Sequence, residues 1–560
     1  MNWLLPPPNG GRPGEPPVWL KRSLMGLFLA GCLLGAASVW RRYFIFTDGA
    51  VYAALGQNLA NGIGLKYGGA VHLFYPPGYP VAIAVLYAFI RDAEMAAHLA
   101  SYFAYLGTIL LTIRLAWSLR PSPLFTLQSG FIVIFHPYMI LYASYALSES
   151  LFACTVVASA YCAWKLTDKR APLWLWGLWG ILGGYLYLIR ADGIVYWPLQ
   201  AAFLFWVHRR ALRPFILRAA ASAFLMLLVM SPYLHLIKQE TGKWRLSTKT
   251  SILLEFSRMK MQDDSARGET RQTSRLSEDG KTFAIDRSQE TLGGFLTHHP
   301  DEALQRILWN AKRLIRRPGL AFSWLSILLL VFLGILLKKR FFYSPSIFLL
   351  IHALPIGLFL VFYVEDRFLL SFIPFFAFAY ARAGEHLWGL ARLHFNKRFW
   401  MASVSLILIF TLGFVWTARP QLAQISRRVF SSNLPLEHKK LGNWMKENLP
   451  ISPDTRITHR NPWVSFYAGG CHARTPDFDA HLSEEERTEK LVRWCREVGV
   501  RYVVVDERMT APNMPGLGFL LEEDKPHHGL QWLKTIEDDP FPKIVLYALQ
   551  DGSQPAGVSQ

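Results

Sequence analysis

The chain has 560 residues, of which 52% are hydrophobic and 14% are aromatic, and its formal net charge is +19. Its apolar runs of about 16 to 22 residues can cross ~30 Å of hydrocarbon, which excludes a soluble globular protein and predicts a polytopic membrane protein. The basic residues gather in short loops between these runs, and zinc-finger, Walker and dinucleotide-binding motifs do not occur, so the charge indicates membrane orientation and no nucleic-acid partner.

The N-terminal residues 1–19 are rich in proline and glycine, which predicts a disordered cytoplasmic tail. A transmembrane domain is expected over residues 20–430, and its first apolar run, 23–40, follows two basic residues. The sequence Leu29-Ala-Gly-Cys32 has the form of a lipoprotein cleavage site. The run continues past the cysteine and many further runs follow, so we interpret it as a retained first span.

A first outer loop with juxtamembrane helices is predicted over residues 41–94. It opens with Asp48 and contains a rigid turn, Tyr75-Pro-Pro-Gly-Tyr-Pro80. A carboxylate placed where a span leaves the bilayer is a functional candidate, and the alternative is a solvated acid that helps a helix to begin. The apolar segment Gly78–Ile90 is too short to cross the bilayer, so we expect a helix at the membrane interface.

With that segment outside the hydrocarbon, about eleven spans are expected, at 23–40, 95–118, 122–142, 148–165, 172–190, 193–208, 215–237, 318–337, 343–364, 367–383 and 399–418. The loops that this topology places in the cytoplasm are all basic, in agreement with the positive-inside rule. The opposite face then carries four ionisable clusters at the ends of spans: Asp48, Ser148-Glu149, Arg190-Ala-Asp192 and Glu365-Asp-Arg367. They can converge on one site, or they are four independent solvated helix ends.

A long outer loop of mixed charge covers residues 238–317. Its last part, Pro300–Arg317, has an acidic first turn and a basic last turn, and its apolar residues share one helical face, namely Leu304, Ile307, Leu308, Ala311, Leu314 and Ile315. This pattern predicts an amphipathic helix on the outer headgroups, with packing on the protein core as the alternative.

From residue 431 the composition becomes that of a soluble domain. Helices are predicted at 436–448 and 483–498, and strands at 456–458, 501–506 and 544–549, which indicates an α/β domain over residues 431–560. The topology places this domain outside the cytoplasm. Cys471 and Cys495 lie outside the spans, so a disulfide between them is predicted in that oxidising compartment.

The motifs at the outer ends of the spans occur in a familiar order: Asp48, the Tyr75–Pro80 turn, Leu147-Ser-Glu149, Ile189-Arg-Ala-Asp-Gly193 and Tyr363–Leu370. Over residues 20–420 the chain thereby resembles the GT-C glycosyltransferases, specifically the bacterial relatives of dolichyl-phosphate-mannose–protein mannosyltransferases and of the lipid A aminoarabinose transferase. The resemblance implies an inverting, mannosyltransferase-like enzyme of the bacterial inner membrane. It would move a sugar from a polyprenyl-phosphate lipid to a protein, lipid or glycan acceptor at the extracytoplasmic face.

The resemblance also implies roles for the ionisable residues. Asp48 matches the first-loop acid of the family and is the candidate base, and Glu149 matches an acid of the second outer loop. A departing lipid phosphate needs a cation, for which Arg190 and Arg367 are candidates. The alternatives are local ion pairs, Arg190 with Asp192, and Arg367 with Glu365 or Asp366.

Three tyrosines, Tyr52, Tyr75 and Tyr79, are candidates for the wall of the sugar pocket, or else belong to the aromatic belt of the membrane interface. Gly49 follows Asp48 where many relatives carry Asp-Glu, and Tyr75 stands where the aminoarabinose transferase has a lysine. Lys66 or His72 remains as a weak substitute for that phosphate contact.

Cysteine, histidine and acidic residues do not occur at metal-ligand spacing, so no cofactor is expected, although Asp48 with Glu149 could hold a divalent metal. Two further functions stay open. One is a lipid-linked sugar flippase or transporter, which would be expected to carry polar groups at mid-membrane depth. The other is a surface polysaccharide polymerase or ligase.

Overall fold

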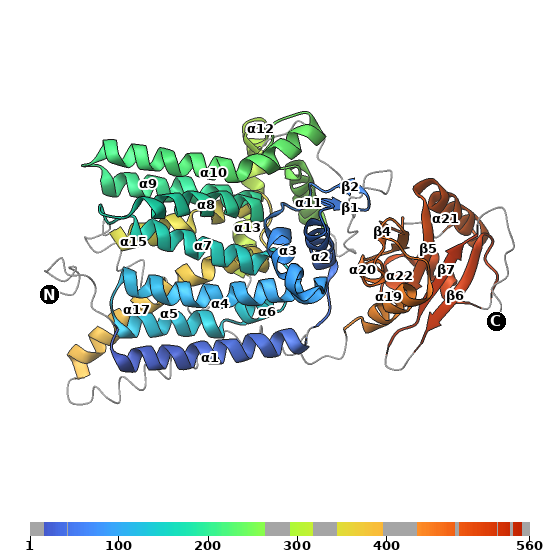
Figure 1. The fold of residues 1–560 in the computed structure, drawn as a ribbon, viewed down its shortest axis with the longest axis horizontal. Helices are drawn as coiled ribbons and strands as arrows, with labels where there is room; N and C mark the ends of the chain where they lie inside the picture. Colours follow the sequence, from blue (N-terminus) through green and yellow to red (C-terminus); the bar gives the residue numbers. More distant parts are fainter. Residues whose placement is uncertain are drawn as a thin grey trace.

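The computed structural model describes residues 16–41, 43–263, 292–316, 344–395, 434–476, 481–523, 525–537 and 541–550. A bundle of helices runs along one direction, and a domain with a sheet lies at one end of it (Figure 1). The predicted spans 318–337 and 399–418 lie outside the described residues. Of the predicted tail only residues 16–19 are described, and helix α1 already begins at Val18.

The bundle contains three described helices that are long and apolar enough to cross a membrane: α1 (Val18–Arg41), α4 (Ala93–Leu119) and α10 (Leu212–Thr241). Helices α5 (Pro123–Phe135) and α6 (Pro137–Ala143) form a fourth candidate that bends by 53°. The bend lies at His136, because a residue before proline avoids the helical region. These criteria do not confirm the predicted number of about eleven spans.

Shorter helices complete the bundle: α7 (Ser148–Lys165), α8 (Leu173–Ile189), α9 (Tyr196–His208), α15 (Ser344–Ala353), α16 (Ile356–Val361) and α17 (Ile373–Phe395). Two 3₁₀ turns, η1 (Ala191–Val195) and η3 (Asp366–Phe372), precede α9 and α17. Helices α8 and α10 lie in backbone contact, since a Cβ atom added at Gly180 would lie 2.1 Å from the carbonyl oxygen of Ser222. Glycine at this position lets the two helices approach closely.

The first outer loop forms α2 (Thr47–Ala60), a two-stranded hairpin of β1 (Lys66–Tyr67) and β2 (Ala70–Val71), and α3 (Gly78–Ile90). Helix α3 has the bounds predicted for the interfacial helix. Its first residue must be small, because a Cβ atom on Gly78 would lie 2.6 Å from the backbone nitrogen of Ile189. The turn before α3 is thereby held against the end of α8.

The long outer loop contains α11 (Thr250–Asp263), α12 (Leu292–His298) and α13 (Pro300–Arg316). Helix α13 is the predicted amphipathic helix, and it packs on α16, as in the alternative arrangement. The Asn310 amide donates to the carbonyl oxygen of Leu360 at 2.8 Å. The predicted apolar face is divided, because Ile307 packs inward whereas Leu304 and Leu308 are 56% and 62% exposed.

The C-terminal domain is an α/β fold. It comprises α19 (Leu436–Asn448), β3 (Arg456–His459), α20 (Trp463–Ala468), β4 (Cys471–Arg474), α21 (Glu484–Val498), β5 (Val500–Asp506), α22 (Thr510–Asn513), η5 (Pro515–Leu521), β6 (Leu530–Ile536) and β7 (Ile544–Leu549). The strand order is β4-β3-β5-β7-β6; β3 pairs in parallel with β4 and β5, and β7 runs antiparallel to β5 and β6. Ser483 and Glu486 form a capping box that begins α21. The sequence predicted three of these five strands and missed β4 and β6.

The predicted disulfide is wrong: Cys471 and Cys495 are both buried free thiols. Cys495 lies on α21 and packs into the apolar core, whereas Cys471 lies on the edge strand β4. Each thiol is buried in its own surroundings, and the two were paired only because they are the cysteines outside the apolar runs.

The C-terminal domain docks on the first outer loop. The Tyr467 hydroxyl donates to the Glu94 carboxylate at 2.7 Å and accepts from the backbone N–H of Ile45 at 3.1 Å. The Lys439 ammonium pairs with the same carboxylate at 2.7 Å. These contacts hold the sheet domain over the beginning of α2, where the acid of the first loop lies.

Candidate functional site

A cavity of about 570 Å³ lies between the helix bundle and the C-terminal domain. The turn after α8, the first turns of α2 and α7, and η3 line it from the bundle. The segment that connects α10 to α11 lines a second side, and the loop after β3 together with strand β4 lines a third. Helix ends and strand ends that are far apart in sequence therefore share one space.

The four ionisable clusters that the sequence places at one membrane face meet in this cavity. Its lining includes Asp48, Glu149, Arg190, Asp192, Glu365 and Arg367. Each of them lies at the end of a helix or in the turn beside one, because the apolar interior of a span excludes charge. The bundle thus brings together these six charged residues that the sequence analysis assigned to the site.

Asp48 lies in the first turn of α2, where the helix dipole favours negative charge. One carboxylate oxygen accepts from the Arg367 guanidinium at 3.1 Å, and the other accepts from the Tyr75 hydroxyl at 3.0 Å. The next residue, Gly49, must be a glycine for a steric reason, because a Cβ atom there would lie 2.9 Å from the carbonyl oxygen of Ala146. The close approach of α2 to that segment accounts for the missing second acid of the loop.

Arg367 is the centre of an ion-pair network of three carboxylates. Its guanidinium lies 2.6 Å from Glu365, 3.1 Å from Asp48 and 3.9 Å from Glu149. The local pair with Glu365, weighed as an alternative role for this arginine, is therefore present together with the placement in the cavity. The Glu149 side chain is 6% exposed, and one of its oxygens has no hydrogen-bond partner among the described residues.

Arg190 also forms the local pair that was its alternative role. It donates two hydrogen bonds to Asp192, at 3.0 and 3.2 Å. Its guanidinium carbon lies 5.0 Å from the Phe152 ring centroid and 4.8 Å from that of Phe368. An arginine held on both sides by rings and from the end by a carboxylate has a fixed orientation at the cavity wall.

The three candidate tyrosines separate into two groups. Tyr52 and Tyr75 line the cavity, and Tyr52 donates to the Ser148 hydroxyl at 3.4 Å. Tyr79 is buried behind them, where its hydroxyl donates to the carbonyl oxygen of Ala97 at 2.8 Å and its ring packs edge-on against Tyr52. Tyr79 therefore supports the wall, and it is not among the described lining residues.

The two weak candidates for a phosphate contact do not line the cavity either. Lys66 is exposed on the hairpin. His72 is buried and stacks on Tyr75, and burial lowers the pKa of His72 to about 3, so the imidazole is neutral at pH 7.

Lys249 is the cation that sequence reasoning missed. It lines the cavity, with its ammonium 5.4 Å from the ring centroid of Phe74 and 6.0 Å from that of Tyr75. Among the described residues no carboxylate lies within ion-pair distance of it. Burial, and next the nearby Arg190 guanidinium, lower the pKa of Lys249 to about 8. A lysine in a long polar loop gives no sequence signal of this kind.

The C-terminal domain contributes a second group of missed residues: Arg460, Asn461, His472 and Arg474. Most of them lie at the carboxyl ends of β3 and β4, and parallel neighbours end at the same edge of a sheet. Asn461 accepts a hydrogen bond from the Thr47 hydroxyl at 3.3 Å, beside Asp48. If strand β4 had been predicted from the sequence as a parallel neighbour of β3, the shared carboxyl edge of the two strands would have been a candidate for part of the site.

Apolar side chains complete the lining beside these charges. Leu246, Ile252, Leu253, Leu358, Phe359 and Phe362 form this apolar wall. A cavity that joins arginine and lysine side chains to an apolar wall suits a ligand with an anionic group and a hydrocarbon chain. Of the two carboxylates named above for a metal, Asp48 accepts a hydrogen bond from Arg367, and Glu149 lies 3.9 Å from the same guanidinium. A separate group of side chains in the C-terminal domain has its potential ligand atoms close enough together to hold a metal ion, and it comprises His438, His459 and Asp506.

No family model matches the sequence, and no curated protein sequence matches it. Solved structures do match. The oligosaccharyltransferase of Archaeoglobus fulgidus, in complex with zinc and sulfate, is 14% identical with a TM-score of 0.56, and the match covers 86% of this chain and 68% of that one. The oligosaccharyltransferase AglB from the same organism, with an inhibitory peptide and a dolichol-phosphate, gives 0.55 at 14% identity, over 96% and 75%.

ArnT from Cupriavidus metallidurans in the apo state gives a TM-score of 0.56 at 12% identity, over 94% of this chain and 98% of that one. Its structure bound to undecaprenyl phosphate gives 0.52 at 11% identity. The chain therefore has the fold of the GT-C glycosyltransferase superfamily, and the predicted resemblance is confirmed at the level of the fold.

Proposed function

We propose that the protein is an integral membrane glycosyltransferase of the bacterial inner membrane. It moves a sugar from a polyprenyl-phosphate donor to a protein, lipid or glycan acceptor at the extracytoplasmic face. One observation carries this proposal: a single cavity places Arg190, Lys249 and Arg367 beside an apolar wall and a row of carboxylates. That combination matches each part of a lipid-linked sugar phosphate.

The donor would lie with its phosphate among the three cations and the first part of its chain along Leu246, Leu253 and Phe359. Arginine binds phosphate bidentately and stays charged, and the lysine adds a point charge. The matching structures with a dolichol-phosphate and with undecaprenyl phosphate support a lipid phosphate as ligand. The sugar would then reach the tyrosines Tyr52 and Tyr75.

The transfer breaks the bond between the anomeric carbon and the phosphate oxygen. The acceptor heteroatom forms the new bond to that carbon, its proton passes to a carboxylate, and the polyprenyl phosphate leaves with the electron pair. Asp48 is the proposed base, and Glu149 positions the sugar or the acceptor. A donor phosphate that attracts Arg367 would compete with Asp48 for the guanidinium and leave that carboxylate oxygen free to accept the proton.

The acceptor would approach from the side of the C-terminal domain, since Arg460, Asn461 and Arg474 line the cavity there. The position of this domain next to Asp48 supports the role, because the base must reach the acceptor proton. The extracytoplasmic placement of the domain belongs to the proposal and rests on the basic loops of the opposite face.

The test is transfer by purified protein in lipid nanodiscs, supplied with polyprenyl-phosphate sugars and with peptide, lipid and glycan acceptors. The expected result is release of polyprenyl phosphate with stoichiometric glycosylation of one acceptor class. A flippase would instead move the intact donor across proteoliposomes and leave the sugar–phosphate bond unbroken, and that result would overturn the proposal.

A further inference from the structure

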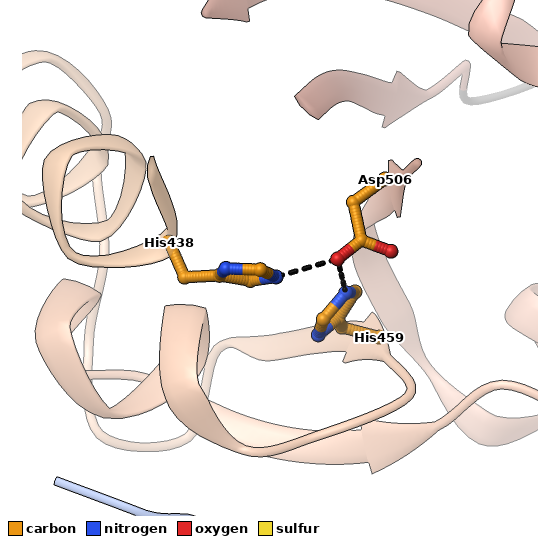
Figure 2. A group of neighbouring side chains, drawn as sticks. All are labelled: His438, His459 and Asp506. Atoms are coloured by element: carbon orange, nitrogen blue, oxygen red, sulfur yellow. Dashed lines mark hydrogen bonds and ion pairs between the residues drawn. The ribbon is translucent and has the colours of Figure 1, made fainter. Parts of the chain in front are cut away.

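A fully buried group of two imidazoles and one carboxylate lies at the sheet edge that faces the cavity. His438 comes from α19, His459 ends β3 and Asp506 ends β5 (Figure 2). Strands β3 and β5 are parallel neighbours, so their carboxyl ends lie at the same edge of the sheet. The three side chains are at most 1% exposed, and their ligand atoms lie within 4.8 Å of one another.

Both histidines direct Nε2 at the same oxygen of Asp506, at 2.6 Å from His438 and 3.4 Å from His459 (Figure 2). Nε2 of His459 has no hydrogen-bond partner among the described residues. Buried polar atoms are normally satisfied, so an unsatisfied imidazole nitrogen aimed at a carboxylate indicates a missing ligand. A hydrogen bond between His438 and Asp506 alone would not explain why the buried imidazole of His459 points at the same carboxylate oxygen.

The surroundings orient each of the three ligand atoms. Nδ1 of His438 lies 3.2 Å from the Glu437 carboxylate but forms no hydrogen bond among the described residues, and Nδ1 of His459 lies 3.0 Å from the carbonyl oxygen and 3.3 Å from the backbone nitrogen of Asn461. The second oxygen of Asp506 accepts hydrogen bonds from the Thr510 N–H and hydroxyl and from the Met509 N–H. Metal-binding imidazoles commonly donate their other N–H to a carboxylate or carbonyl, and ligating carboxylates are held in the same way.

We propose that His438, His459 and Asp506 bind a divalent transition metal, with zinc as the ion that this donor set favours. Ligand atoms about 2.0 to 2.1 Å from a tetrahedral zinc lie about 3.3 Å apart, close to the separation between His459 and Asp506. His438 and Asp506, which lie 2.6 Å apart in their direct hydrogen bond, would have to separate by about 0.7 Å. Water would fill the fourth position.

The site has a defined place relative to the cavity. Arg460, Asn461 and Pro462, which line the cavity, follow His459 directly. A metal that fixes His459 to α19 and β5 therefore fixes the loop that contacts Thr47. The proposal concerns metal binding by these residues and does not depend on the transfer reaction.

The test measures metal content by mass spectrometry in the full-length protein, purified without chelators and supplied with zinc. Wild-type protein should retain about one equivalent, and His459→Phe and Asp506→Asn should reduce it by at least about tenfold. His527→Phe, another histidine of this domain, and Asp48→Asn should retain the wild-type amount. Loss of zinc in Asp48→Asn with retention in His459→Phe would place the metal at the cavity and overturn the proposal.

Two further measurements guard against variants that fail to fold. Anomalous scattering at the zinc edge from wild-type crystals should give a peak between the three side chains. Chelation should lower the Tm of wild-type protein and leave the Tm of His459→Phe unchanged. Wild-type protein without stoichiometric metal, in which a protonated His438 bridges Glu437 and Asp506, would contradict the proposal.

Discussion

Asp48 and Arg367 form an ion pair at 3.1 Å. The proposed reaction needs Asp48 for the proton of the acceptor and Arg367 for the phosphate of the donor. A carboxylate that is paired with a guanidinium is a weak base, and a paired guanidinium is a weak phosphate ligand. The donor phosphate resolves both problems at once, because it competes for the guanidinium. The roles of the two residues can therefore be separated by substitution.

Asp48→Asn should reduce transfer by about 10²- to 10⁴-fold and leave donor affinity nearly unchanged, because the amide keeps the shape but cannot accept a proton. Arg367→Ala should lower donor affinity together with the rate, since the charge meets the phosphate before and during the reaction. Turnover and donor binding in purified protein distinguish them, with thermal melts as a control for folding. Retention of more than about a tenth of wild-type turnover by Asp48→Asn would refute its role as base.

Lys249 gives the site a pH dependence. Its pKa of about 8 means that the ammonium is charged below that pH and neutral above it, so donor affinity should fall as the pH rises through 8. The loss of one charge-assisted hydrogen bond should weaken binding by about tenfold. Lys249→Arg keeps its charge at every relevant pH and should remove this dependence. An equal fall in both proteins would assign the titration to another group.

The site residues that the sequence revealed and those that it concealed differ in their surroundings. Asp48, Glu149 and Arg367 stand beside apolar runs, where a charge is rare and therefore informative. Lys249 and Arg460 lie in polar segments, where a charge is ordinary and only the fold shows that it faces a cavity.

At the scale of elements, periodicity predicted most helices, because long apolar runs and polar turns are strong signals. Helix α3 and helix α7 have the predicted bounds. Strand β4 was missed because Cys-His-Ala-Arg is short and has no apolar run. The direction that α13 faces followed the alternative, packing on the protein, and the predicted single apolar face was divided, because Ile307 packs inward whereas Leu304 and Leu308 are exposed.

The contact between α8 and α10 predicts a steric effect. Gly180→Ala would place a methyl group against the Ser222 carbonyl, so the helices must separate, at a cost of about 1–3 kcal/mol. Gly177→Ala is the matched control on the same helix, because its methyl group would meet only the end of the Leu225 side chain at 3.3 Å. Thermal melts in detergent should show a lower Tm for Gly180→Ala alone. Equal melting of the two variants would contradict the close packing.

At the scale of the molecule, one carboxylate joins the bundle to the C-terminal domain. Glu94 holds both Lys439 and Tyr467, and its side chain is 7% exposed. Composition indicated a separate α/β domain, but an interface between domains leaves no periodic pattern. The sequence therefore gave no sign that this domain completes the cavity.

Glu94→Gln should weaken this interface by about 1–3 kcal/mol, because Lys439 loses its counter-ion. The partial exposure of Lys439 to solvent limits the loss. Hydrogen exchange should increase around Ile45 and Tyr467, whose backbone and hydroxyl groups meet there. Glu489→Gln is the control, since Glu489 forms an exposed pair with Arg493 on α21. Unchanged exchange in Glu94→Gln would show that the remaining contacts hold the domains together without this carboxylate.

The proposed topology predicts where the C-terminal domain lies. A phosphatase reporter that folds only outside the cytoplasm should be active when it is fused after Ser432. The reason is that the basic loops keep the opposite face of the bundle in the cytoplasm. A reporter that is active only in the cytoplasm should be silent at the same position. The opposite pattern would overturn both the topology and the assignment of the site to the outer face.

Two parts of the chain form the cavity: helix ends supply acids and arginines on one side, and the loop after β3 with strand β4 supplies the other. Loops at strand ends accept substitutions without loss of the sheet that carries them. Mutations at Arg460 and Asn461, in the loop after β3, would therefore change the proposed acceptor wall and leave the proposed donor site intact. Over evolutionary time, a lineage could acquire a new acceptor through this loop and inherit its donor chemistry unaltered.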